Sequence, residues 1–124
     1  MDKRILVDMS LTVLHHGHIR LLKKASELGY VIVGLCSDEE IFKAKGFKPL
    51  LSYEQRKEIA LAIKYVREVI KSEYLIDEEY LDKHNIDLLV HGDDNVNVIP
   101  QDRLVIFLRT EGISSTQLRN SSQT

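Results

Sequence analysis

The chain has one cysteine, no excess of basic residues and no long hydrophobic run, and each absence excludes a class of protein. Cys36 is the only cysteine, so the chain cannot form an internal disulfide, which favours a reducing compartment. Seventeen basic residues against nineteen acidic ones leave a formal net charge of −2, which argues against a general nucleic-acid or membrane-surface binder. No apolar run reaches roughly 18 residues, and no signal peptide is recognisable. We therefore expect a cytoplasmic protein without a membrane span.

What the sequence does contain is typical of a globular domain. Hydrophobic residues make up 44% and charged residues 29% of its 124 residues, so disorder is not expected. This length supports a real core but not two of them, and we predict a single domain over residues 1–124. Cys36 ends an apolar run that begins at Val31, which favours a buried structural thiol over a catalytic one.

Short apolar runs alternate along the chain with amphipathic segments. The apolar runs predict strands at residues 4–8, 30–36, 86–91 and 103–108, and a weak alternation predicts one more at 65–70. The amphipathic segments predict helices at 17–28, where Gly29 is the expected stop, from Ser52 to about 63, at 77–84, and after Ser114 or Ser115. This alternation predicts an α/β fold, a Rossmann-like doubly wound sheet of five parallel strands with helices on both faces.

In such sheets a ligand binds outside the carboxyl ends of the strands, near the point where the strand order reverses. The unusual polar segments of this sequence follow the predicted strands in that way: residues 15–18, Ser37-Asp38, residues 92–94 and residues 109–115. Ser37 also has the pattern of a helix N-cap before an acidic first turn. We expect one site, assembled from both ends of the chain.

Three histidines and a glycine, His15, His16, Gly17 and His18, stand where the first strand passes to the first helix. A helix start presents unpaired backbone N–H groups and a positive dipole end, and imidazoles add further donors for phosphate oxygens. Gly17 allows a close backbone approach. Zinc is the alternative, but the spacing does not place two histidines on one helix face, and no cysteine pair accompanies them. The motif predicts a phosphate-handling site.

Other polar segments have both a structural and a functional interpretation. Arg109 precedes a glycine turn and several hydroxyl residues; a capped helix explains the hydroxyl groups, whereas the arginine favours a second phosphate contact. Gly92-Asp93-Asp94 is either a simple turn or a patch for the nucleotide or its magnesium. A polar loop with Lys43, Lys45 and Lys48 is either solvated or closes over a triphosphate. Considered alone, Arg56 and Lys64 are expected to be exposed and His91 to be structural.

Together these segments resemble a known family. The H-x-G-H motif, the run from Ser52 to Lys57, Gly92-Asp93-Asp94 and the run from Arg109 to Thr116 are similar to the small cytidylyltransferases typified by glycerol-3-phosphate cytidylyltransferase. The similarity extends from Ile5 to about Arg119. The chain is also similar to cytidylyltransferase domains of phosphonate and capsule-modification pathways.

The resemblance implies a reaction in which CTP and a small phosphorylated acceptor give a CDP-linked product and pyrophosphate. The acceptor phosphate attacks the α-phosphorus in line, so catalysis consists of positioning and charge stabilisation. The resemblance also implies a homodimer and Mg²⁺, held mainly by the CTP phosphates and with no metal-ligating residue assigned in the chain.

The same resemblance assigns roles to individual residues. It implies that His15, His18, Lys45 and Arg109 are catalytic. It implies that the nucleotide is bound by Met9, Ser10, Leu11, Gly17, His91, Gly92, Asp93, Asp94, Thr110, Gly112, Ile113, Ser114 and Ser115. Arg56 and Lys64 are implied to lie at the acceptor or in the mobile loop.

Three positions depart from the family pattern. Thr12 replaces the usual acidic residue before H-x-G-H, Lys64 replaces an arginine, and Asn95 replaces an aromatic residue. Thr12 argues against a metal held by a carboxylate at that point. Lys64 and Asn95 touch the region assigned to the acceptor or loop, so the acceptor is open among L-glutamine phosphate, a phosphonate and glycerol 3-phosphate, for capsule or surface-polysaccharide precursor synthesis. Thr12 and Lys64 also keep a second function open, a catalytically silent nucleotide-binding module that regulates a partner.

Overall fold

The computed structural model of the protein describes residues 3–93 and 95–107. Asp94, Arg109, the run from Thr110 to Ser115 and the predicted C-terminal helix lie outside these described residues. The predictions made for them therefore stay predictions.

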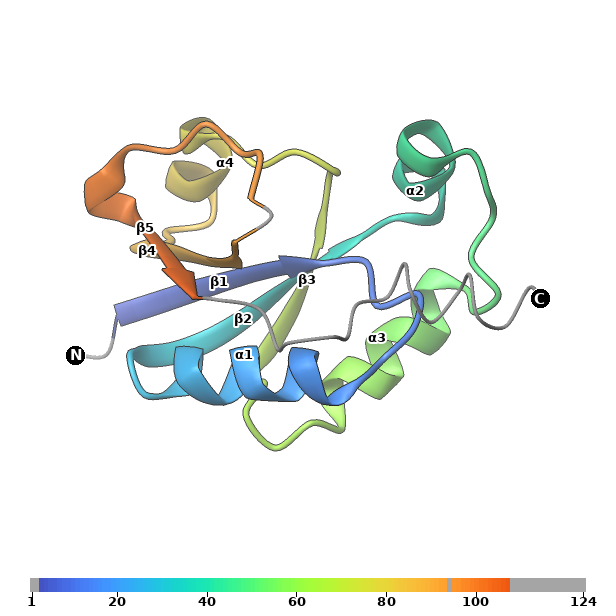
Figure 1. Ribbon diagram of the computed structural model, residues 1–124, viewed down its shortest axis with the longest axis horizontal. Coiled ribbons are helices and arrows are strands. Elements are labelled where there is room, and N and C mark those ends of the chain that lie inside the picture. Colours follow the sequence, from blue (N-terminus) through green and yellow to red (C-terminus); the bar gives the residue numbers. More distant parts are fainter. Residues whose placement is uncertain (1–2, 94, 108–124) are drawn as a thin grey trace.

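Five parallel strands form one sheet in the described part of the chain (Figure 1). The strands are β1 (Lys3–Met9), β2 (Gly29–Cys36), β3 (Glu68–Ser72), β4 (Leu88–Gly92) and β5 (Leu104–Phe107). Their spatial order is β3-β2-β1-β4-β5. The chain therefore winds from β1 toward one edge and then returns to fill the other, as a doubly wound sheet requires.

Helices cover both faces of this sheet, which confirms the predicted fold class. Figure 1 shows α1 (His16–Ser26) and α3 (Tyr53–Leu61) on one face and α4 (Glu78–Lys83) on the other. The remaining helix, α2 (Asp38–Lys45), follows the carboxyl end of β2, and a 3₁₀ turn (Gln101–Arg103) leads into β5. Ser37 caps α2 and Ser52 caps α3, both as predicted.

Alternate residues of each central strand enter two different cores. Ile5 and Val7 of β1 pack into the core under α1 and α3, whereas Leu6 between them packs into the core under α4. All three side chains are fully buried. Because both faces are covered, the strand reads as a continuous apolar run and not as an alternating one.

Two predicted boundaries are wrong. The third strand begins at Glu68 and not at residue 65, because the chain before it forms a turn in which Val66 N–H donates to the Ile63 carbonyl. The first helix ends at Ser26 with Glu27 as C-cap, so Gly29 is not its stop. Gly29 instead starts β2, where a Cβ would lie 2.3 Å from the Lys3 carbonyl oxygen. The glycine is required by this close strand contact.

The predicted polar lysine loop is also partly wrong. Lys43 and Lys45 lie in the last turn of α2, where cations interact favourably with the negative end of the helix dipole. Gly46 ends that helix in the left-handed conformation, with φ of 76°. Only the connection after Gly46, which includes Lys48, has no regular structure.

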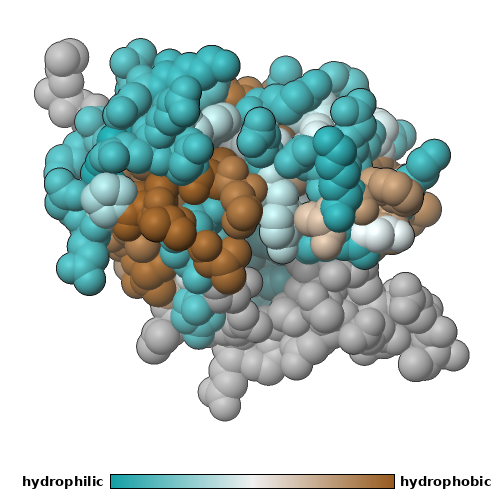
Figure 2. Space-filling model, turned by 90° about the horizontal axis from the view of Figure 1, so that it is seen from above, coloured by the Kyte–Doolittle hydropathy of each residue, from teal (hydrophilic) through white to brown (hydrophobic). Residues whose placement is uncertain are grey.

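In the described residues, no helix is both long and apolar enough to cross a membrane. Hydrophobic residues nevertheless gather on one side of the face that Figure 2 shows from above. The connection between β4 and β5 contains two strongly exposed valines, Val96 at 68% and Val98 at 91%. Asn97 between them points inward, and its side-chain oxygen accepts the Ile76 N–H at 2.6 Å.

Candidate active site

The strand order reverses between β1 and β4, which are neighbours at the centre of the sheet. Val7 of β1 is paired with Val90 of β4, so the next residues along, Asp8 and His91, lie side by side at the carboxyl edge. The loop that leaves β1 here leads directly to α1 and its histidines (Figure 1). This is the place where a doubly wound sheet binds its ligand.

His15 and His18 form a reciprocal cap at the start of α1. The Nδ1 atom of His15 accepts the Gly17 N–H at 3.0 Å, and the Nδ1 atom of His18 accepts the His15 N–H at 3.1 Å. Their ring centroids are 4.1 Å apart. The arrangement is that of a capping box in which imidazoles replace the usual hydroxyl and carboxylate or amide side chains.

This cap determines which nitrogen of each ring carries the proton. Because Nδ1 accepts a hydrogen bond in both rings, the neutral imidazoles carry hydrogen on Nε2 and can donate from there. A protonated Nε2 has no lone pair for a metal, so the geometry argues against the zinc alternative. It also corrects one expectation: the amides of His15 and Gly17 are occupied by the cap. The Nε2–H groups of the imidazoles are therefore the better hydrogen-bond donors for phosphate, and the positive end of the helix dipole adds to the attraction.

The surroundings of His15 favour its neutral form. Burial lowers the pKa of the His15 imidazole below its usual value, and the neighbouring His16 lowers it further. A protonated ring would also lose the acceptor that holds the Gly17 N–H. The helix cap and the neutral state of His15 therefore support each other.

Asp8 is a candidate site residue that sequence reasoning missed. Its side chain is 10% exposed, and its Oδ1 atom lies 3.5 Å from Nε2 of His91. Among the described residues that oxygen is buried without a hydrogen-bond partner, an arrangement that is costly for a carboxylate. The position of Asp8 directly after the apolar run Ile5–Val7 was the available signal, because a charge there falls at the edge where ligands bind.

The prediction that Arg56 is exposed is wrong. Its side chain has no exposed surface and donates hydrogen bonds to the Ser10, Cys36 and Leu51 carbonyl oxygens and to the Asp38 carboxylate. A direct contact with the acceptor is therefore excluded for the conformation seen here. Its helical spacing with Tyr53 and Ala60, both on the apolar face of α3, was a signal for burial.

The end of β1 and the loop that follows it hold three of the predicted nucleotide-binding residues. Met9 is the last residue of β1, and the Ser10 carbonyl is bonded to Arg56. Leu11 has a left-handed backbone with φ of 53° and a side chain that is only 5% exposed. The Leu11 side chain packs in the core under α1 and α3, so we expect any contact with a nucleotide to come from its backbone.

The other predicted residues fall into two groups. His91 and Gly92 end β4 and Asp93 follows in a turn. All three therefore lie at the same edge as the segment from residue 10 to residue 18, the β1–α1 loop and the first turn of α1, which we call the histidine loop. Lys64 is exposed, as expected, but follows α3 in the turn that leads to the amino end of β3. Within this chain the structure does not bring Lys64 to the candidate site.

Cys36 is buried at 4% exposure, as predicted. Burial, followed by the charge of Glu40, raises the pKa of its thiol to about 11, so the reactive thiolate is disfavoured.

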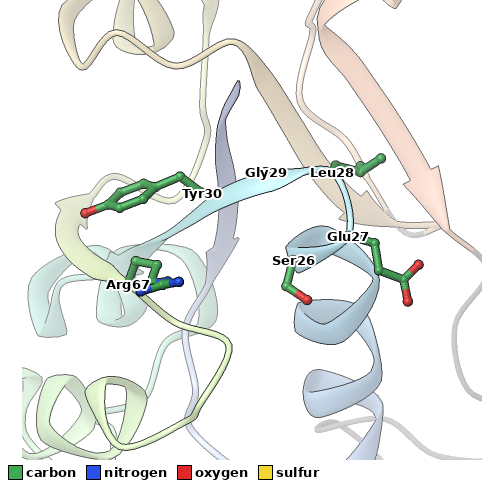
Figure 3. A pocket seen from close by; sticks show the side chains of 6 residues that line it. All are labelled: Ser26, Glu27, Leu28, Gly29, Tyr30 and Arg67. Atoms are coloured by element: carbon green, nitrogen blue, oxygen red, sulfur yellow. The ribbon is translucent and has the colours of Figure 1, made fainter. Parts of the chain in front are cut away.

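A small surface hollow of about 260 Å³ lies at the opposite end of the sheet (Figure 3). It is lined by Ser26, Glu27, Leu28, Gly29, Tyr30 and Arg67, from the end of α1 and the starts of β2 and β3. None of the predicted site residues that the structure describes lines it. It is therefore separate from the candidate active site.

Comparison with known proteins agrees with the class of fold described above. A model of the cytidylyltransferase-like family matches residues 12–121. The chain belongs to this family, and the resemblance noted in the sequence is confirmed.

Two kinds of relatives are similar over almost the whole chain. Glycerol-3-phosphate cytidylyltransferase of Bacillus subtilis is 38% identical, with 94% of this chain and 95% of the relative covered. Ethanolamine-phosphate cytidylyltransferases of Dictyostelium discoideum and Mus musculus are 37% and 39% identical, each over 93% of this chain. The chain spans about a third of the length of these two relatives, 35% and 31% respectively.

A solved structure supports the fold. A lipopolysaccharide core biosynthesis protein from Thermoplasma volcanium superposes with a TM-score of 0.73, covering 88% of this chain and 98% of that one, at 18% identity. At this identity the likeness concerns the fold alone.

Proposed function

We propose that this protein is a cytidylyltransferase that joins CTP to a small phosphorylated acceptor. An acceptor phosphate oxygen forms a bond to the α-phosphorus of CTP, the bond from that phosphorus to the bridging oxygen breaks, and pyrophosphate leaves. The observation that carries the proposal is the pair of histidines that cap α1, whose Nδ1 atoms accept hydrogen bonds from backbone N–H groups. Family membership and the names of the relatives support it.

In this proposal His15 and His18 supply charge stabilisation. Their Nε2–H groups would donate to phosphate oxygens as negative charge shifts toward the leaving pyrophosphate. Both rings are held by the helix they cap, so little reorganisation is needed when the substrate arrives. Lys45 and Arg109 remain the further catalytic residues of the proposal, together with the predicted nucleotide contacts.

Magnesium belongs to the same proposal and would neutralise the triphosphate. Mg²⁺ prefers several oxygen ligands and usually keeps water and substrate phosphates among them. The described residues contain no group of three His, Cys, Asp or Glu side chains placed to hold a metal ion. The phosphate oxygens of CTP would therefore be its main ligands. The homodimer is a further part of the proposal and rests on the resemblance.

We propose that the acceptor carries an ammonium group, as ethanolamine phosphate and L-glutamine phosphate do. The buried Oδ1 of Asp8 has no hydrogen-bond partner among the described residues, and an ammonium would satisfy both its charge and its lone pairs. Two of the relatives are named for ethanolamine phosphate. Glycerol 3-phosphate, which names another relative, and phosphonates without an amino group lack this partner. Use of the product for surface polysaccharide remains a proposal from the resemblance.

Pyrophosphate release from MgCTP tests both levels of the proposal. The acceptor panel contains ethanolamine phosphate, L-glutamine phosphate, glycerol 3-phosphate and 2-aminoethylphosphonate. We expect turnover with the ammonium-bearing acceptors. Asp8→Asn should lower kcat/KM for them by about 10- to 100-fold, the loss of one charged hydrogen bond, and should change kcat/KM for glycerol 3-phosphate by less than about threefold. Asp102→Asn, at an exposed residue of the 3₁₀ turn that leads into β5, is the matched control.

The outcomes separate the proposal about the acceptor from the proposal about the transfer reaction. If glycerol 3-phosphate is preferred, or if Asp8→Asn affects all acceptors equally, the ammonium proposal fails and the transferase proposal stands. If CTP binds and no acceptor is turned over, the transferase proposal fails, and the regulatory nucleotide-binding module takes its place.

A further inference from the structure

Arg56 is a fully buried cation at the same edge of the sheet as the candidate active site. Its Nη1 atom donates to the Ser10 carbonyl at 2.6 Å and to the Cys36 carbonyl at 2.8 Å, and its Nε donates to the Leu51 carbonyl at 3.1 Å. Its Nη2 donates to the Asp38 carboxylate at 2.5 Å. A buried guanidinium is tolerated only with such extensive bonding.

The partners of Arg56 belong to segments that are far apart in the sequence. Ser10 lies in the loop after β1, Cys36 ends β2, and Leu51 precedes α3. Asp38 is the first residue of α2. The planar fork of the guanidinium therefore joins three chain segments of the carboxyl edge at one point, which a lysine ammonium cannot do with the same geometry.

One of these bonds reaches the histidine loop. The residue after Ser10 is Leu11, whose left-handed backbone is unfavourable for a leucine and persists only where its surroundings hold it. The bond from Arg56 to the Ser10 carbonyl holds the peptide that enters this turn. His15 follows a few residues later as the N-cap of α1.

The ion pair of Arg56 with Asp38 reaches α2, the helix that carries Lys45. Asp38 accepts from Arg56 through Oδ1 and from the Tyr53 N–H through Oδ2 at 3.3 Å. Lys45 lies in the last turn of the same helix. Arg56 thus links the start of α2 to the loop that precedes His15 and His18.

We propose that Arg56 is a positioning residue for the nucleotide site. It touches no substrate; it sets the β1–α1 loop, and through it the imidazoles of His15 and His18, in register with α2. This proposal rests on the phosphate-binding role proposed for the histidines. The resemblance implies a place for Arg56 at the acceptor or in the mobile loop, whereas here Arg56 acts from a fully buried position.

The test compares Arg56→Lys and Arg56→Met with Arg67→Met, an exposed arginine at the opposite end of the sheet. Activity is expressed per folded molecule, with the folded fraction taken from urea unfolding at the assay temperature. Displacing catalytic groups by about 1 Å costs about 100-fold in rate. We expect about that loss in kcat/KM for Arg56→Met and about 10-fold for Arg56→Lys, with Arg67→Met within about threefold of wild type.

A double-mutant cycle with His18→Gln separates positioning from general support of the fold. If Arg56 acts through the histidine loop, Arg56→Lys should cost less than about threefold in the His18→Gln background. Equal losses in both backgrounds would overturn the proposal, as would an unchanged activity per folded molecule in Arg56→Lys. If Arg56→Met does not fold, Arg56→Lys and Asp38→Asn still decide. If His18→Gln alone leaves turnover unchanged, the proposed site fails, which is a distinguishable result.

Discussion

The two ends of the parallel sheet treat their polar groups differently. At the amino end, donors and acceptors are matched: the Arg4 N–H donates to Asp87 at 2.8 Å and the Arg4 Nε to the Asn85 carbonyl at 3.1 Å. The Tyr30 hydroxyl donates to Glu68 at 3.2 Å. Such pairing ties β1, β2, β3 and the start of β4 together, as expected of a region that contributes to stability.

At the carboxyl end, several groups are in costly states. Asp8 Oδ1 and Ser72 Oγ are the buried side-chain atoms without a hydrogen-bond partner among the described residues. Leu11 holds a left-handed backbone, which costs about 1–2 kcal/mol for a residue other than glycine. Unsatisfied and strained groups concentrate where a protein binds ligands. The contrast therefore supports the proposed site at the carboxyl end and favours structural support at the amino end.

The largest expected effect comes from removing the imidazoles and keeping their cap. Asn at position 15 and Gln at position 18 can accept the same backbone N–H groups, so the helix start should survive. His15→Asn or His18→Gln should lower kcat by about 100- to 1000-fold, the loss of one positioned donor. Steady-state pyrophosphate release measures the effect.

Alanine variants provide the matched control. His15→Ala and His18→Ala remove both the imidazole and the cap, so each should also lower the free energy of unfolding by about 0.5–2 kcal/mol. The Asn and Gln variants should stay near wild type in urea unfolding. Wild-type turnover in His18→Gln would contradict the assigned role, whatever its stability.

A second variant disturbs the contact between β1 and β2 at the amino end of the sheet. Gly29→Ala places a Cβ 2.3 Å from the Lys3 carbonyl oxygen, so β1 and β2 must separate there. We expect a loss of about 1–3 kcal/mol in the free energy of unfolding, typical of overpacking. Turnover per folded molecule should be unchanged. A variant of full stability and reduced turnover would show that the two ends are not separate in function.

The smallest effect is a pH dependence from His15. Its pKa is lowered in the folded protein by burial and by His16, so below about pH 6.5 the unfolded chain binds more protons there. The free energy of unfolding should therefore fall as the pH decreases from about 6.5 through the lowered pKa. His15→Asn should lack this contribution. Urea unfolding of both proteins across this range measures the difference, and identical pH profiles would contradict it.

Most of the fold could be predicted from the sequence because the central strands β1, β2 and β4 contain short, buried apolar runs. Gly29 was misassigned because its role depends on Lys3, a residue of another strand that approaches closely. The polar residues around Lys43 and Lys45 favour a loop in the sequence, although the N-cap at Ser37 begins a helix that includes both lysines. These errors concern boundaries, which depend on contacts that sequence spacing does not reveal.

The candidate site likewise contains residues that the sequence predicts and residues that it does not. The histidine loop could be predicted because strand end, glycine and imidazoles are contiguous. Asp8 and Arg56 could not, because their significance comes from partners on other strands and loops: His91 for Asp8, and Ser10 and Asp38 for Arg56. A charge in the sequence does not reveal whether folding satisfies it.

Pyrophosphate release from MgCTP and ethanolamine phosphate, measured for the wild type and for His18→Gln at equal folded concentration, tests the central claim most directly. We predict steady turnover by the wild type and a loss of about 100-fold or more in the variant, with urea unfolding near that of the wild type. Equal turnover by the two proteins would contradict the claim that the histidines that cap α1 form the catalytic centre.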